Sequence, residues 1–185
     1  MNNKIILVTD NFKIKLVVDT LHSKINLESL LNNPTTNENL ILEGVEVYER
    51  NNKGIYESLS GADVRAIKTS GIVLAYSSQQ KIYSPLYQNS SLMPIKFRVK
   101  GLNNGLIGKV QVSGRHIPTT KIDKLKYISR QLNSKSFVKF YEPHQRKGQT
   151  EFQNLFDGIL DVQDISPVLL NITDKSVYSM SIPEE

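Results

Sequence analysis

The sequence predicts a mainly β protein of the α+β class, an antiparallel β-sandwich or split barrel with two short helices. Three observations support this fold class. Segments that alternate apolar and polar side chains recur along the chain, turn signals separate several of them, and no β-α-β alternation runs long enough to indicate a parallel doubly wound sheet. With 185 residues, the chain is long enough for one ordinary domain or two small ones.

The N-terminal segments 4–8 and 12–16 predict an opening hairpin. The pair Asp10-Asn11 that separates them is typical of a turn. Segment 12–16 alternates apolar side chains with Lys13 and Lys15, which is the period of a β-strand.

Three further elements are predicted before residue 80. A short helix is predicted near 21–32, and it ends at an Asn-Asn-Pro sequence because a residue that precedes proline disfavours helical geometry. Residues 40–50 alternate as a strand does, and Asn51–Gly54 supplies turn residues that accept positive φ, so a hairpin is predicted over 40–58. Another strand is predicted at 72–76.

The second half opens with another predicted hairpin. In 95–100 apolar residues take one face and basic residues the other, and the Gly- and Asn-rich stretch 101–105 separates this segment from 107–112. Further strands are predicted at 137–141, 158–165 and 177–182.

The best-defined predicted helix spans about 121–133. Thr120, with Asp123 three residues later, forms an N-terminal capping signal. The apolar residues at helical spacing are Ile122, Leu125, Ile128 and Leu132. We expect this stripe to pack against a sheet that contains 137–141 and 158–165, with basic residues on the opposite helix face.

The chain shows no clear boundary between domains. No linker rich in glycine, serine or proline separates the two halves. The sequence therefore suggests a β-rich N-terminal part over 1–80 and a hairpin–helix–β part over 81–185, and a single domain is the alternative.

Charge is strongly segregated along the sequence. Residues 1–80 hold 8 basic and 9 acidic residues, a net charge of −1, and residues 81–147 hold 14 and 2, a net charge of +12. Residues 148–185 hold 1 and 7, a net charge of −6. The basic middle segment therefore indicates a phosphate-rich partner, an acidic protein surface, or the acidic C-terminal third of the same chain.

The basic segment supplies the residues expected on an interaction surface. These are Lys96, Arg98, Lys100, Lys109, Arg115, Lys121, Lys124 and Arg130. Their expected acidic counterparts are Asp157, Asp161 and Asp164. Nucleic acid is the alternative partner, with Phe97, Tyr83 or Tyr87 as stacking platforms. Phe97, however, alternates with the basic residues and is expected to face the core.

Catalytic signatures are weak. The sequence has no cysteine, which excludes disulfides, thiolate zinc sites and cysteine nucleophiles. The glycine-rich stretch 101–109 lacks the spacing of a phosphate loop, and the C-terminal carboxylates lack that of a calcium loop. We therefore predict no enzyme, cofactor or metal site. A hydrolase is the third alternative, and its candidate residues would be Ser113, His116 and Asp157.

No segment has the character of a membrane span. The longest apolar runs, 5–8 and 168–170, are far too short, and the first four residues lead into no signal-type apolar region. We expect a soluble protein that is made in a cytoplasm and binds no membrane.

The last 65 residues, approximately, contain a distinctive order of elements. A helix over 122–132 is followed by Ser136–Pro143, a variable polar loop, the segment Phe156–Val162 with its aromatic-acid-glycine-apolar start, and a final alternating strand. This order resembles tail-tube and baseplate proteins of tailed bacteriophages, including distal tail proteins. The resemblance implies a β-rich structural subunit of a virion that packs against identical copies in a ring, without catalysis. It supplies no functional residues.

Overall fold

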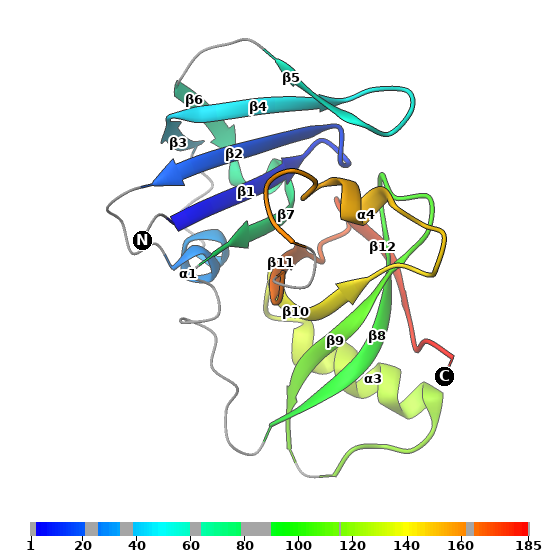
Figure 1. Cartoon of the computed structure of the whole chain (residues 1–185). Coiled ribbons are helices and arrows are strands. Elements are labelled where there is room, and N and C mark those ends of the chain that lie inside the picture. The colour runs from blue at the N-terminus through cyan, green and yellow to red at the C-terminus, as the bar shows by residue number, and fades with distance from the viewer. Residues whose placement is uncertain are drawn as a thin grey trace.

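The computed structural model describes residues 3–20, 26–33, 39–59, 64–78, 90–114, 116–161 and 165–184. Within these ranges the protein is mainly β, which confirms the predicted fold class. A 10-stranded antiparallel sheet runs through the molecule, a two-stranded sheet lies at one end, and short helices complete the fold (Figure 1).

The large sheet has the strand order β12-β8-β9-β10-β11-β7-β1-β2-β4-β5, and β3 and β6 form the small sheet. The strands are β1 (Asn3–Thr9), β2 (Ile14–Thr20), β3 (Asn39–Glu43), β4 (Val45–Arg50), β5 (Tyr56–Leu59), β6 (Val64–Lys68), β7 (Ile72–Ser77), β8 (Ser90–Val99), β9 (Leu106–Ser113), β10 (Phe137–His144), β11 (Val168–Asn171) and β12 (Val177–Ser181). The helices are α1 (Leu27–Asn32), α3 (Lys121–Leu132), α4 (Glu151–Asn154) and the 3-10 turn η1 (Thr69–Gly71). The short helix predicted near 21–32 is thus present as α1, while 21–25 lie outside the described residues.

The three predicted hairpins form as β1-β2, β4-β5 and β8-β9. In the first turn the Lys13 N–H donates to the Asp10 carbonyl at 3.1 Å, and Asp10, Asn11 and Phe12 all take positive φ. In the second turn the Asn51 side-chain oxygen accepts from two backbone N–H groups. Local turn chemistry therefore sets the pairing of neighbouring strands.

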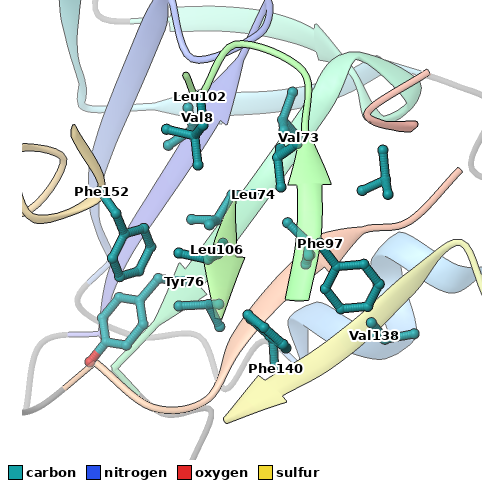
Figure 2. Packing of buried hydrophobic residues seen from close by; sticks show 14 of the residues in the cluster. Val8, Val73, Leu74, Tyr76, Phe97, Leu102, Leu106, Val138, Phe140 and Phe152 are labelled. Carbon is teal, nitrogen blue, oxygen red and sulfur yellow. The ribbon is translucent and has the colours of Figure 1, made fainter. Parts of the chain in front are cut away.

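The large sheet curls so that one of its faces, the inner face, packs against itself. Val8 and Leu74, from β1 and β7, belong to the same apolar cluster as Phe97, Leu106 and Phe140, from β8, β9 and β10. Figure 2 shows these side chains gathered in one core. All five are fully buried. Strands that are distant in the sheet thus share a core, which gives the body its sandwich-like architecture.

The opposite, outer face of the N-terminal strands is also covered. Leu7 and Leu16, on this face of β1 and β2, pack in a second cluster with Leu27 and Leu31 of α1 and Leu42 of β3. Strands β1, β7 and β11 therefore bury side chains on both faces. The outer face of β8 and β9, in contrast, is only partly buried.

The structure divides the single strand predicted over 40–50 into two. Gly44 has a φ of 65°, a left-handed conformation that interrupts the extended backbone and that glycine adopts without strain. As a result, β3 pairs with β6 in the small sheet, while β4 pairs with β2 and β5 in the large one.

The best-defined predicted helix is confirmed as α3. The Thr120 hydroxyl accepts a hydrogen bond from the Asp123 N–H at 3.2 Å and lies 2.8 Å from the carboxylate of the same residue. Ile128 and Leu132 are buried in the core of the inner face. Ile122 is 69% exposed, so its predicted place in the buried stripe is wrong. The helix packs through its C-terminal half, and its first turn faces solvent at this position.

The strand predicted at 158–165 is wrong for the described residues 158–161. The turn that follows helix α4 reaches residue 159 instead, because Phe152 and Phe156 bury their rings in the core at helical spacing, with centroids 5.3 Å apart. Gly158 then takes a φ of 75°, which an extended strand does not allow. Helix α3 therefore does not pack against a strand at 158–161.

We expect replacement by alanine at the two isoleucines of α3 to change the free energy of unfolding by very different amounts. Ile128→Ala should lower the free energy of unfolding by about 2–5 kcal/mol, because the fully buried side chain leaves a cavity. Ile122→Ala, the matched exposed control, should change it by less than about 0.5 kcal/mol. Urea unfolding followed by circular dichroism measures both values, and similar losses in the two variants would contradict the packing described for α3.

Candidate interaction surfaces

A group of basic side chains lies on the outer face of β8. Lys96 and Arg98 alternate along this strand with Ile95 and Phe97, which are fully buried on the inner face. Partial burial lowers the pKa of Lys96, and the positive charges of Arg98 and Arg146 lower it further. Positive charges thus gather near Lys96, as they do on protein surfaces that bind an anionic partner. Phe97 is no stacking platform, while Tyr83 and Tyr87 lie outside the described residues.

Two other predicted basic residues make contacts within the chain. The Lys109 ammonium lies 2.9 Å from a carboxylate oxygen of Glu142. Lys100 donates its side-chain hydrogen bond to the backbone carbonyl of Asp174. The Glu142 carboxylate offsets the charge of Lys109, whereas Lys100 keeps its full charge but is held against the chain.

The basic residues of α3 belong to a different surface. Ile128 and Leu132 of α3 pack in the same cluster as Val110 and Val112 of β9, whose side chains point away from the side that carries Lys109. The outward-facing bases of the helix, Lys121, Lys124 and Arg130, are therefore separated by the sheet from those of β8. The structure does not unite the predicted basic residues on one surface, and Arg115 lies outside the described residues.

The acidic C-terminal third contacts the N-terminal third. Glu151 lies 3.9 Å from the Arg50 guanidinium, and Asp157 acts electrostatically on Lys15 of β2. In the basic segment, Lys135 and Lys139 approach Glu28 of α1 at 3.8 and 3.5 Å. The predicted acidic counterpart Asp157 thus faces the core side of the N-terminal sheet. Of the other two, Asp161 ends the described range and Asp164 lies outside it.

A second acidic surface escaped the sequence analysis. Exposed glutamates lie on three successive strands of the N-terminal end, and they are Glu43 of β3, Glu46 and Glu49 of β4, and Glu57 of β5. Glu49 and Glu57 share the outer face of the β4-β5 hairpin, whereas Glu46 lies on the opposite face of β4, where it accepts a hydrogen bond from the Tyr48 hydroxyl. Glu49 stands directly opposite Glu57 across the β4-β5 pair, where like charges repel. The segment charge of −1 over 1–80 hid this cluster, because the lysines and arginines of the segment offset its acidic residues.

Lys15 forms the most unusual polar site of the described chain. It is the only charged residue there that is buried, with 2% exposure. Its ammonium donates to the Leu155 carbonyl at 2.9 Å and lies 4.8 and 4.5 Å from the ring centroids of Tyr48 and Tyr56. Burial lowers the pKa of Lys15 to about 8, against the opposing effect of Asp157.

The contacts of Lys15 join β2 to the segment that follows α4. The sequence analysis did not predict this site. Cation–π contacts with two tyrosines replace part of the lost hydration of the ammonium. The Tyr56 hydroxyl in turn donates to the Phe12 carbonyl. The alternation in 12–16 gives no sign that one of its lysines is buried, because that burial depends on residues 140 positions away.

The candidate hydrolase residues do not converge. The Ser113 hydroxyl donates to the Gln131 side chain of α3 at 3.0 Å, whereas Asp157 lies beside Lys15. His116 follows in the loop before α3. Among the described residues, no three carboxylate or imidazole side chains are grouped as a metal site requires.

Comparisons with protein-family models, curated proteins and solved structures gave no match. None of the helices in the described ranges combines the length and apolar character needed to cross a membrane.

The buried ammonium predicts a specific pH dependence of stability. The pKa of Lys15 falls from 10.5 to about 8 on folding, so the unfolded chain binds more protons between these pH values. The free energy of unfolding should therefore rise as the pH increases above about 8, and Lys15→Met should remove most of that rise. Urea unfolding between about pH 7 and 9.5 measures it, below the range where tyrosine ionisation interferes.

Lys53→Met is the matched control, because Lys53 is exposed in the β4-β5 turn. In Lys53→Met the free energy of unfolding should rise with pH as it does in the wild type. The interpretation fails if the wild type and Lys15→Met show the same slope with pH. Burial raises the pKa of Tyr56, which opposes the rise only at higher pH, where free tyrosine ionises.

Proposed function

We propose that this protein is a non-enzymatic structural subunit that joins head to tail with other copies in a large assembly. The observation that carries this proposal is the separation of charge in space. The exposed glutamates lie on β3, β4 and β5, and the cations of α3 lie at the opposite end of the molecule (Figure 1). The cations of β8 lie on the outer face of that strand, which is followed by a turn beside Arg50 of β4. Two copies placed with these acidic and basic surfaces in contact would bring opposite charges together.

A head-to-tail contact uses two different surfaces of the same chain. Such an interface closes into a ring if the rotation between copies permits, and otherwise continues as a tube or filament. Each exposed ion pair contributes only about 0–1 kcal/mol, so several pairs must act together. The clustering of Glu49 with Glu57, and of Lys96 with Arg98, provides such multiple pairs.

As the specific assembly we propose a bacteriophage tail or baseplate. The resemblance to tail-tube and baseplate proteins supports it, since α3 is followed by β10, which contains Pro143 near its end. The strand that the resemblance places after 156 is not present in 158–161. The support therefore comes from the helix–strand pair, the β-rich body and the polarity of charge.

Charge reversal at each end tests the proposal. Glu49→Lys with Glu57→Lys, and separately Lys96→Glu with Arg98→Glu, should each weaken self-association at least ten-fold in mass photometry at low salt, because like charges then face each other. Mixing the two variants should restore assembly, since the unaltered surfaces pair as in the wild type and the two reversed surfaces carry opposite charges. The mixture should therefore form rings or tubes visible by electron microscopy, as the wild type does, while each variant alone does not.

Glu184→Lys is the matched control, because this exposed glutamate lies outside the β3-β5 surface. It should assemble as the wild type does. A wild type that stays monomeric at high concentration, or variants that assemble unchanged, would contradict the proposal. Assembly should also weaken with salt, since charges are screened beyond about 8 Å at physiological ionic strength.

Nucleic acid is the second candidate partner, and the cation group on β8 favours it. Lys96, Arg98 and Arg146 gather without a carboxylate among the influences on the pKa of Lys96. If this surface binds phosphates, a fluorescein-labelled single-stranded DNA should bind with an affinity that falls steeply with salt, and Lys96→Glu with Arg98→Glu should abolish binding. Undiminished binding by the variant, or no binding at low salt, would remove this candidate.

A further inference from the structure

A groove lies between the two sheets at the N-terminal end of the molecule. Its volume is about 470 Å³, within the range of ligand-binding sites in proteins. Apolar side chains on the outer face of β2, β4 and β5 line one wall, and they include Leu16, Val47 and Leu59. Leu59 is 40% exposed, whereas Leu16 and Val47 are buried, so this wall is open to solvent at Leu59.

The opposite wall is formed by the edge of β6. Four successive residues of this strand, 65–68, line the groove, although successive side chains of a strand point to opposite faces. A strand that contributes residues of both faces presents its backbone edge. Strand β6 pairs only with β3, so its other edge is unpaired within the described residues.

Positive charge surrounds the groove. Arg65, Lys68 and Lys175 line it, with Asp10 as the acidic lining residue. None of the three cations forms an ion pair with the described residues. The groove thus combines an apolar wall, an open strand edge and a cationic rim.

We propose that this groove binds an extended segment of another protein chain in which apolar and acidic residues alternate. The segment adds to β6 as a third strand of the small sheet, in the manner of β-strand addition. Its apolar side chains contact Leu16, Val47 and Leu59, its carboxylates lie on the opposite face with Lys68, and Arg65 adds positive charge on the groove side. The five residues of β6 accommodate a segment of about 17 Å. This inference goes beyond the proposed head-to-tail contact and does not depend on it.

A labelled peptide tests the groove directly. Fluorescein-labelled Val-Glu-Val-Glu-Val-Glu-Val should bind the full-length protein in fluorescence anisotropy at least ten-fold more tightly than the same peptide with Lys in place of Glu, or with Ser in place of Val. Arg65→Glu should weaken binding at least ten-fold. Lys53→Glu, the same charge change at the exposed β4-β5 turn, should leave binding unchanged.

Hydrogen exchange locates the bound peptide. Saturating peptide should slow exchange of backbone amides in 64–68, because their unpaired N–H groups become hydrogen-bonded. Equal binding of the three peptides, equal binding by Arg65→Glu, or protection confined to other strands would each overturn the proposal. If the peptide does not bind, the proposal of self-association still stands. If the protein stays monomeric, the proposal of peptide binding still stands, so the two proposals can be contradicted separately.

Discussion

Burial of the central strands on both faces is the constraint on which the rest of the fold depends. Strands β1, β7 and β11 expose neither face, so other elements must pack against both sides of the large sheet there. The C-terminal strands β8, β9 and β10 supply one cover by curling over the inner face. The outer face is covered by α1 and β3, and β3 lies in the small sheet because the chain turns at Gly44 before it enters the large sheet as β4.

Local patterns of the sequence are sufficient for the hairpins, for the Thr120 cap and for the fold class. Each depends on residues close together in the chain, such as Asp10-Asn11 in the first turn. The region 151–161 was predicted wrongly because a short apolar run has no distinctive period, and burial of Phe152 and Phe156 in a distant core decides its conformation. The exposure of Ile122 likewise depends on tertiary packing, which buries the helix at Ile128 and Leu132.

The candidate surfaces were predicted only in part for the same reason. Segment charges identify which residues are basic or acidic, but not which of them meet in space. The structure places Glu151 and Asp157 beside cations of the N-terminal third. The carboxylates that remain exposed as a group are those of Glu49 and Glu57 on the β4-β5 hairpin, so the acidic surface comes from a segment whose net charge is nearly zero.

The β4-β5 hairpin packs against the core with one face and forms part of the candidate surfaces with the other. Its inner face holds Tyr48 and Tyr56 around the buried ammonium of Lys15. Its outer face carries Glu49 and Glu57 and contributes one wall of the groove. Edge strands are ordinarily the most mobile part of a sheet, since only one neighbour holds them. Two kinds of contact hold the inner face of this hairpin against the core. They are the cation–π contacts with Lys15 and the hydrogen bond that the Tyr56 hydroxyl donates to a backbone carbonyl of the first turn. A buried lysine, unfavourable for stability by itself, thus fixes the orientation of the strands that present the acidic surface.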